Sequence, residues 1–200
     1  MKKLILASKS PRRREILSML GLHIEILSLD TDEAGERNRL TPAELVTGLA
    51  CRKVRAAWDA LRDREDLDDC VVLSADTVVA YNGEILEKPS DAEDARRMLR
   101  MLSGKRHTVF TGVAVMHRGA LALDVQKTDV YFRTISEEEI DDYVASGEPM
   151  DKAGAYAAQG RGSLFVSRID GDYFNVVGLP AEKVDAMMKQ TFGFGLRDMA

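Results

Sequence analysis

A single aspartate, Asp76, stands in a mostly apolar stretch of this 200-residue chain. The stretch Val71–Ala80 is predicted to be a strand buried on both faces, and strands seldom contain aspartate. An isolated carboxylate is costly to keep charged in apolar surroundings, so Asp76 needs a metal, a cation or a proton beside it. Asp76 is therefore a candidate metal ligand or general base. The alternative is a carboxylate that accepts hydrogen bonds from a neighbouring turn.

A basic segment near the N-terminus is the second candidate for chemistry. Leu4–Ala7 is predicted to be a strand, and Ser10 and Pro11 suit the N-cap and first position of a helix. Backbone N–H groups and the helix dipole favour an anion there. Four cations stand at the same end, where the dipole alone would disfavour them: Lys9, Arg12, Arg13 and Arg14. The pattern predicts a bound phosphate chain, and the alternatives are a solvated basic patch or a kinase site.

Further strands and helices are predicted around these two segments. His23–Leu29 is a predicted strand, and Glu33 in the loop after it is either solvated or a metal ligand. Three capping boxes predict helices after Thr41, Ser90 and Ser136, the first of them ending near Arg64. Hairpin turns are predicted at Asn82-Gly83, Arg118-Gly119 and Asp170-Gly171, and a last helix from Pro180. Strands and helices alternate early and hairpins enter later, which predicts an α/β protein with a mixed sheet.

Composition restricts the kind of protein. Hydrophobic residues make up 45% and charged residues 30% of the chain, as in ordinary globular proteins. The formal charge of −5 argues against general nucleic-acid binding. Cys51 and Cys70 form no CxxC pair, which disfavours a zinc site or a disulfide framework. No apolar run approaches the ~20 residues of a membrane span. We expect a single domain over residues 1–200, in the cytoplasm, without nucleic-acid or membrane partners.

Several stretches in combination resemble one protein family. The N-terminal segment 7–13 (ASKSPRR) is similar to the signature of the Maf proteins, which are nucleoside triphosphate pyrophosphatases once described as septum-formation inhibitors. Further matches are Ala50 with Lys53, segment 75–77 (ADT), segment 86–89 (LEKP), segment 151–156 (DKAGAY) with Gln159, and segment 173–180. The resemblance covers residues 4 to about 190.

The resemblance implies a fold, an activity and a set of site residues. The implied fold has a mixed twisted sheet with flanking helices and two lobes around a deep cleft, similar to the inosine-triphosphate pyrophosphatases, in a homodimer. The implied reaction is metal-dependent hydrolysis of a nucleoside triphosphate to the monophosphate and pyrophosphate, as nucleotide-pool house-cleaning. Asp76 matches the family's proton acceptor, and Thr77 matches the subgroup that acts on dTTP and UTP. Substrate is implied to contact Ser8, Arg12, Arg13, Lys53, Thr77, Lys88 and Gln159.

The chemistry of these residues agrees with the implied reaction. Cleaving a triphosphate needs neutralised charge and an aligned water more than covalent chemistry. Arginines and lysines can neutralise the phosphates, while Asp76 and Glu33 can hold Mg²⁺ or Mn²⁺, because Mg²⁺ takes one or two carboxylates beside waters and phosphates. Two other readings stay open: a nucleotide-binding regulator of cell division, and a nucleotidyltransferase that passes the nucleotide to a second substrate.

Overall fold

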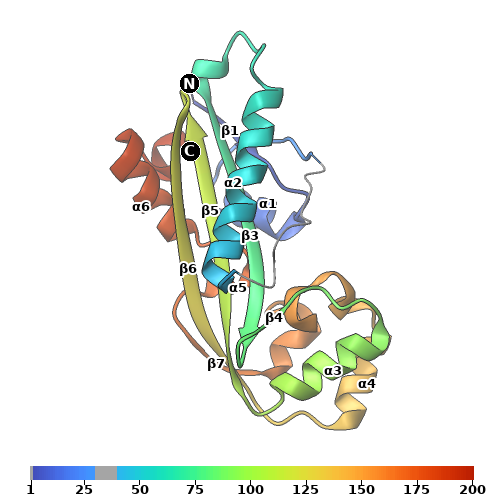
Figure 1. Cartoon of the computed structure of the whole chain (residues 1–200). Coiled ribbons are helices and arrows are strands. Elements are labelled where there is room, and N and C mark those ends of the chain that lie inside the picture. The colour runs from blue at the N-terminus through green and yellow to red at the C-terminus, as the bar shows by residue number, and fades with distance from the viewer. Residues whose placement is uncertain (1, 30–39) are drawn as a thin grey trace. The chain divides into compact units, whose positions relative to one another are not determined.

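The computed structural model describes residues 2–29 and 40–200 (Figure 1). The described residues form a seven-stranded mixed sheet with strand order β2-β1-β3-β5-β6-β7, and β4 pairs with β3 outside this order. The strands are β1 (Lys3–Leu6), β2 (Ile24–Ile26), β3 (Cys70–Tyr81), β4 (Glu84–Leu86), β5 (Arg106–His117), β6 (Ala120–Phe132) and β7 (Val166–Asp170). Strand β1 is parallel to β2 and β3, whereas β4 and β7 are antiparallel to β3 and β6. The predicted α/β class with a mixed sheet is confirmed.

Helices accompany the sheet. The α-helices are α1 (Pro11–Met19), α2 (Pro42–Ala60), α3 (Ala92–Leu102), α4 (Glu137–Ala145), α5 (Tyr173–Val177) and α6 (Ala181–Phe192). Short 3₁₀ segments are η2 (Leu67–Asp69), η3 (Glu148–Asp151), η4 (Ala153–Ala155), η5 (Gly160–Phe165) and η6 (Leu196–Met199). None of the helices in the described ranges combines the length and the apolar character that crossing a lipid bilayer demands.

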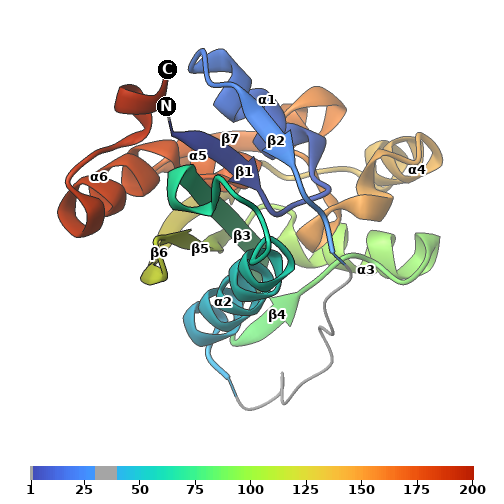
Figure 2. The same ribbon diagram turned by 90° about the horizontal axis from the view of Figure 1, so that it is seen from above.

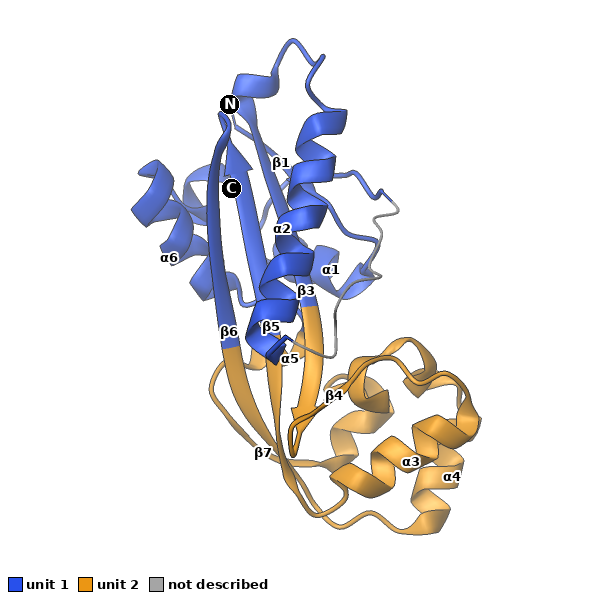
Figure 3. Cartoon of the chain, viewed as in Figure 1, with its two compact units in different colours: residues 1–76, 111–126, 178–200 blue, residues 77–110, 127–177 orange. Residues whose placement is uncertain are grey.

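The chain divides into two compact units (Figure 3). Unit 1 contains residues 1–76, 111–126 and 178–200, and unit 2 contains residues 77–110 and 127–177. Strands β3, β5 and β6 contribute residues to both units. The single two-lobed domain over residues 1–200 and its deep cleft stay predictions.

Unit 1 has a core of aliphatic side chains between α2 and the sheet. Ile5 on β1, Val72 on β3 and Ala114 on β5 are fully buried together with Val54 and Ala57 of α2. Helix α2 covers one face of the sheet, and α6 covers the other (Figure 2). Burial of this apolar area, worth roughly 25 cal/mol per Å², fixes α2 against β3.

Unit 2 has an aromatic core. The Phe132 ring packs edge-on against the rings of His107, Tyr156 and Phe165, with centroid distances of 4.9, 4.7 and 6.1 Å. Edge-to-face aromatic contacts of this kind add about 0.5–1.5 kcal/mol each beyond the area they bury. Together these rings connect β5 and β6 to the segment 153–165.

Capping residues and glycines in the sequence correctly predicted where several helices begin or end. Thr41 and Ser136 form the predicted capping boxes with Glu44 and Glu139. Gly21 follows α1 with a φ of +76°, a left-handed conformation that glycine adopts without a steric penalty. The second predicted capping box is wrong by one residue, because Asp91 and not Ser90 is the N-cap of α3. The Asp91 carboxylate accepts from the Asp94 N–H at 2.8 Å.

The predicted last hairpin is wrong in its second half. Strand β7 ends at Asp170, but residues 173–177 form helix α5 instead of a returning strand. The Asp172 carboxylate accepts from the Phe174 N–H at 2.7 Å, which favours a helical turn at this point. Asn175 is fully buried and its amide donates to the Val109 carbonyl and to Thr128 Oγ1. A buried amide needs such partners, and β5 and β6 supply them.

Two other predicted elements are shorter than expected. Strand β2 covers only Ile24–Ile26 of the predicted 23–29, and α2 ends at Ala60 instead of near Arg64. Residues 30–39, with Glu33, lie outside the described residues.

Candidate functional site

Strands β1 and β3 bring the basic N-terminal segment to Asp76. The two strands are parallel, and β1 stops at Leu6, opposite Leu73. The Ala7 N–H still donates to the Leu73 carbonyl at 2.8 Å, so the loop after β1 runs beside the next residues of β3. Ligands bind in α/β sheets beyond the carboxyl ends of parallel strands. The loop that begins at Ser8 lies at such an end.

A lysine supplies the cation that Asp76 requires. Lys53 Nζ of α2 lies 2.7 Å from Asp76 Oδ1, and the two side chains are only 19% and 15% exposed. A charge-assisted hydrogen bond between partly buried groups is shorter and stronger than a neutral one. Asp76 is therefore paired with a cation from α2, and the turn-bound alternative does not apply.

Arg13 donates hydrogen bonds to three separate stretches of the chain. Its Nε donates to the Gly178 carbonyl at 2.8 Å, and its Nη1 donates to the Ala75 carbonyl at 2.8 Å and to Ser8 Oγ at 3.0 Å. The rigid planar fork of arginine can serve several acceptors at once, which the lysine ammonium does less precisely. Arg13 thus holds the residue directly before Asp76 and the loop before α1, and adds positive charge to both.

The Ser8 hydroxyl is set up to donate. Its oxygen accepts from Arg13 Nη1 at 3.0 Å and from the Ser10 N–H at 3.2 Å. A hydroxyl oxygen has two lone pairs and one hydrogen, so a further partner of Ser8 must be an acceptor such as a phosphate oxygen. Ser10 is the N-cap of α1 as predicted, but its own side chain makes no capping hydrogen bond.

Other predicted substrate residues fall in both units. Arg12, half-buried on α1, makes no hydrogen bond or ion pair within the part of the chain that the structure describes, so its guanidinium can serve a ligand. Thr77, Lys88 and Gln159 belong to unit 2, where Lys88 is exposed and the other two are half-buried. Their contacts with a substrate stay predictions.

Helix α2 is seated on the sheet by two residues that sequence reasoning did not single out. The buried Ser74 hydroxyl of β3 donates to the Ala50 carbonyl of α2 at 2.7 Å, one turn before Lys53. Gly112 of β5 lies so close to α2 that a Cβ there would come within 2.4 Å of the Val46 carbonyl carbon. A serine within an apolar strand was the available signal, because a buried hydroxyl needs a partner.

Replacing Gly112 with alanine is expected to destabilise the protein by about 1–3 kcal/mol, the usual cost of overfilling a packed site. The obstacle is α2 backbone, which cannot rotate away as a side chain can, so the helix and Lys53 with it must move. Gly48→Ala is the matched control on α2 itself, since a Cβ there meets no atom within 4 Å. That variant should be neutral or stabilised by roughly 0.5–1 kcal/mol. Urea unfolding of both variants and the parent measures the difference, and equal midpoints for Gly112→Ala and the parent would contradict the close seating.

The sequence predicts that Asp76 and Glu33 bind a divalent metal ion. Among the described residues no group of three or more His, Cys, Asp or Glu side chains is placed to hold a metal ion. Mg²⁺ needs fewer protein ligands than that, because waters and substrate phosphates complete its shell. The Asp76 carboxylate fits this requirement: Lys53 occupies Oδ1, and Oδ2 is the oxygen left for a cation. Glu33 lies outside the described residues.

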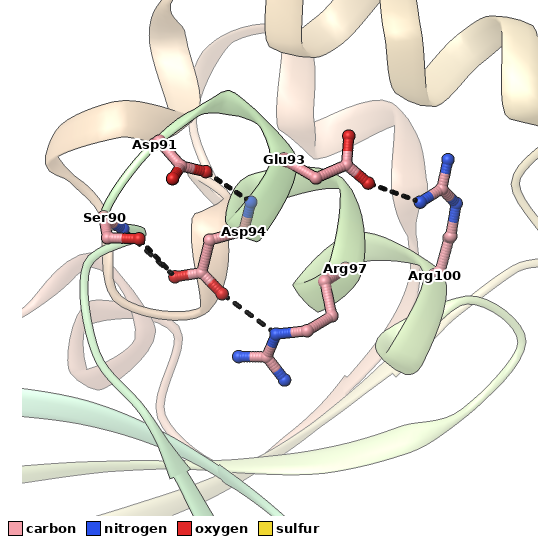
Figure 4. Close-up of a pocket in the computed structure, with 6 residues that line it drawn as sticks. All are labelled: Ser90, Asp91, Glu93, Asp94, Arg97 and Arg100. Atoms are coloured by element: carbon pink, nitrogen blue, oxygen red, sulfur yellow. Dashed lines mark hydrogen bonds and ion pairs between the residues drawn. The ribbon is translucent and has the colours of Figure 1, made fainter.

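A pocket in unit 2 contains none of the predicted residues of that unit, although it begins two residues after Lys88. It is lined by Ser90, Asp91, Glu93, Asp94, Arg97 and Arg100 at the start of α3 (Figure 4). Its acidic groups are already engaged: Asp94 accepts from Arg97, Glu93 pairs with Arg100, and Asp91 caps α3. These ion pairs near the surface stabilise the protein little. Their carboxylates are bound to arginines, and nothing among the described residues of the pocket points to catalysis.

The fold and this site define an α/β protein with a basic loop after its first strand and a cation-paired aspartate on the neighbouring parallel strand. A family model described as "Maf-like protein" matches residues 3–191. The chain belongs to this family, as the resemblance indicated.

Named relatives and solved structures extend the comparison. A Pelotomaculum thermopropionicum protein is 48% identical over 198 residues, covering 98% of this chain and 100% of its own. A Geobacillus protein is 49% identical over 190 residues, covering 95% and 98%. Both are named dTTP/UTP pyrophosphatase. The solved Staphylococcus aureus Ham1 protein is 14% identical with a TM-score of 0.48, over 100% of this chain and 94% of that one.

Proposed function

We propose that this protein hydrolyses nucleoside triphosphates, with dTTP and UTP preferred, to the nucleoside monophosphate and pyrophosphate. The observation that carries the proposal is the Asp76–Lys53 pair beside the loop that Arg13 and Ser8 organise. The name of the two relatives, dTTP/UTP pyrophosphatase, supports the choice of substrates.

The residues of unit 1 divide the work of hydrolysis. Ser8 donates its hydroxyl hydrogen to a phosphate oxygen, and Arg12 and Lys53 neutralise phosphate charge. Asp76 accepts the proton of the water that attacks the α phosphorus, so that pyrophosphate leaves. Arg13 holds Ala75 and therefore the carboxylate in place. A divalent cation, Mg²⁺ or Mn²⁺, bound through Asp76 and Glu33 would neutralise further phosphate charge.

Selection of the base is assigned to residues of unit 2. Uracil and thymine present two carbonyl acceptors and one N–H donor between them. The Gln159 amide can both donate and accept, and the Thr77 hydroxyl can do either. The two bases differ by a methyl group, which apolar contact separates by only about 1–3 kcal/mol. Both should therefore be substrates, while Lys88 adds charge for the phosphates.

The family resemblance also supports the setting in which the reaction takes place. We propose a cytoplasmic homodimer that removes nucleotides from the free pool. A small-molecule triphosphate is the partner in this proposal, without nucleic acid or membrane.

The products of dTTP cleavage test the proposed reaction. Purified protein with Mg²⁺ or Mn²⁺ is expected to convert dTTP to dTMP and pyrophosphate in equal amounts, because attack at the α phosphorus expels the two outer phosphates together. Anion-exchange chromatography identifies both products, and EDTA should abolish the turnover. Release of dTDP and orthophosphate would refute the assignment, and binding of dTTP without any turnover would favour a regulatory binding protein instead.

A further inference from the structure

Glu148 accepts hydrogen bonds from residues around the segment that contains Gln159. Its Oε1 accepts from the Tyr143 hydroxyl at 2.9 Å and from the Gly162 N–H at 3.1 Å, and its Oε2 accepts from the Arg161 N–H at 3.2 Å. The Tyr143 hydroxyl in turn accepts from the Ala157 N–H at 3.1 Å. Backbone on both sides of Gln159 is therefore attached to one carboxylate, directly or through one phenol. All of these residues belong to unit 2.

Two glycines leave the space that the Glu148 carboxylate and the Tyr143 phenol occupy. A Cβ on Gly160 would lie 2.9 Å from Glu148 Oε2, and one on Gly162 would lie 2.6 Å from the Tyr143 hydroxyl. Gly160 also has a φ of +75°, which a side chain would strain. In the structure, these glycines let the backbone close around Glu148.

The electrostatics of Glu148 favour a fixed, ionised group. Burial alone would raise the pKa of Glu148, but hydrogen bonds from Gly162, Tyr143 and Arg161 hold it below its usual value. Tyr143 is buried and its pKa is raised, so the phenol keeps its proton and remains a donor to Glu148. At neutral pH Glu148 thus only accepts, while the Tyr143 hydroxyl donates to Glu148 and accepts from the Ala157 N–H.

We propose that Glu148 and Tyr143 are positioning residues for nucleobase selection, because they fix the backbone on both sides of Gln159. The inference rests on the proposed function, in which the Gln159 amide meets the base. An amide that both donates and accepts discriminates between bases only while its orientation is held. Without Glu148, the Gly162 N–H loses its acceptor, and the Tyr143 hydroxyl that accepts from the Ala157 N–H loses its own acceptor. The segment must then rearrange to satisfy these buried groups.

The test compares Glu148→Ala with variants that separate positioning from stability. Glu148→Gln keeps Oε1 as an acceptor for Tyr143 and Gly162, so it should rescue most of the effect. Glu139→Ala is the matched control in the same unit: Glu139 accepts from the Ser136 N–H and from Arg133, at the other end of α4. That variant loses a comparable set of hydrogen bonds without touching the Gln159 segment.

Three measurements apply to each variant. Amide hydrogen exchange follows the Ala157 and Gly162 N–H groups, calorimetry in EDTA compares the binding of dTTP and dCTP, and steady-state kinetics compares kcat/KM for the same two nucleotides. Glu148→Ala is expected to speed exchange at both amides and to reduce the preference for dTTP over dCTP by about tenfold or more. Glu139→Ala should lower the unfolding midpoint but keep the parent's preference.

The outcomes separate the two proposals. An unchanged preference in Glu148→Ala, or an equal loss in Glu139→Ala, overturns the positioning role while hydrolysis of dTTP by the parent stands. If the parent hydrolyses neither nucleotide, the proposed function fails, and the binding preference of parent against Glu148→Ala still decides the role of Glu148. Parent protein that binds both nucleotides equally overturns the positioning role as well.

Discussion

Replacing Asp76 with asparagine is expected to lower kcat for dTTP by about 10²–10⁴, the usual contribution of a general base. The carboxamide keeps the shape of the side chain and can still accept from Lys53, but it cannot take a proton from water. KM should change less than kcat, since the groups proposed to bind phosphate, Ser8, Arg12 and Lys53, remain. Initial rates of pyrophosphate release at saturating dTTP measure the effect.

The stability of this variant separates chemistry from folding. Lys53 and Asp76 are mostly buried, so weakening their ion pair should cost about 1–3 kcal/mol of unfolding free energy. Asp63→Asn is the matched control, because the same change there affects a pair whose side chains are 77% and 94% exposed. It should leave both rate and stability near those of the parent. A folded Asp76→Asn protein with near-parent kcat would remove Asp76 from the mechanism.

Acid is expected to destabilise unit 2 through His107. Its side chain is 2% exposed, and Nε2 contacts the Tyr156 hydroxyl at 2.8 Å. Burial lowers the pKa of His107 to about 4, although Asp129 acts weakly in the opposite direction. Within the described residues Nδ1 has no hydrogen-bond partner, so a proton added there would lack an acceptor.

The direction of the pH effect follows from this lowered pKa. The unfolded chain binds a proton at His107 near pH 6.5, whereas the folded chain binds it only near pH 4. The unfolded state therefore holds more protons between these values, and the free energy of unfolding falls as the pH falls through that window. A separation of about 2.5 pH units corresponds to about 3 kcal/mol, at about 1.36 kcal/mol per unit. Well above pH 6.5 His107 is neutral in both the folded and the unfolded chain, so its titration no longer changes the free energy of unfolding.

Urea unfolding at pH values from 4 to 7 measures this dependence. His107→Gln keeps a polar contact for Tyr156 and removes the titrating group. Between pH 6.5 and 4 its free energy of unfolding should therefore fall by up to about 3 kcal/mol less than that of the parent. The exposed His23 provides the control, and His23→Gln should retain the parent's pH dependence. Identical pH dependence in His107→Gln and the parent would show that other groups cause the acid effect.

The sequence by itself determined the local elements. Pro11 and Gly21 bound α1, Thr41 and Ser136 begin α2 and α4, and Asn82-Gly83 turns β3 into β4 as predicted. These signals work because a cap or a tight turn involves groups within about four residues of each other. Asp76 was also evident from sequence, since a carboxylate within an apolar strand requires a partner wherever the rest of the chain lies.

Only the tertiary structure decided which groups meet. The sequence offered several cations near Asp76, and the partner is Lys53 because Ser74 and Gly112 set how α2 lies on the sheet. Arg13 donates to the carbonyls of Ala75 and Gly178, which are 62 and 165 residues away, and its contact with phosphate stays a prediction.

Helix α5 also escaped prediction for the same reason. The buried Asn175 amide takes its acceptors from Val109 and Thr128, which are 66 and 47 residues away. Buried polar groups must be satisfied, and the fold alone determines which distant residues supply the acceptors.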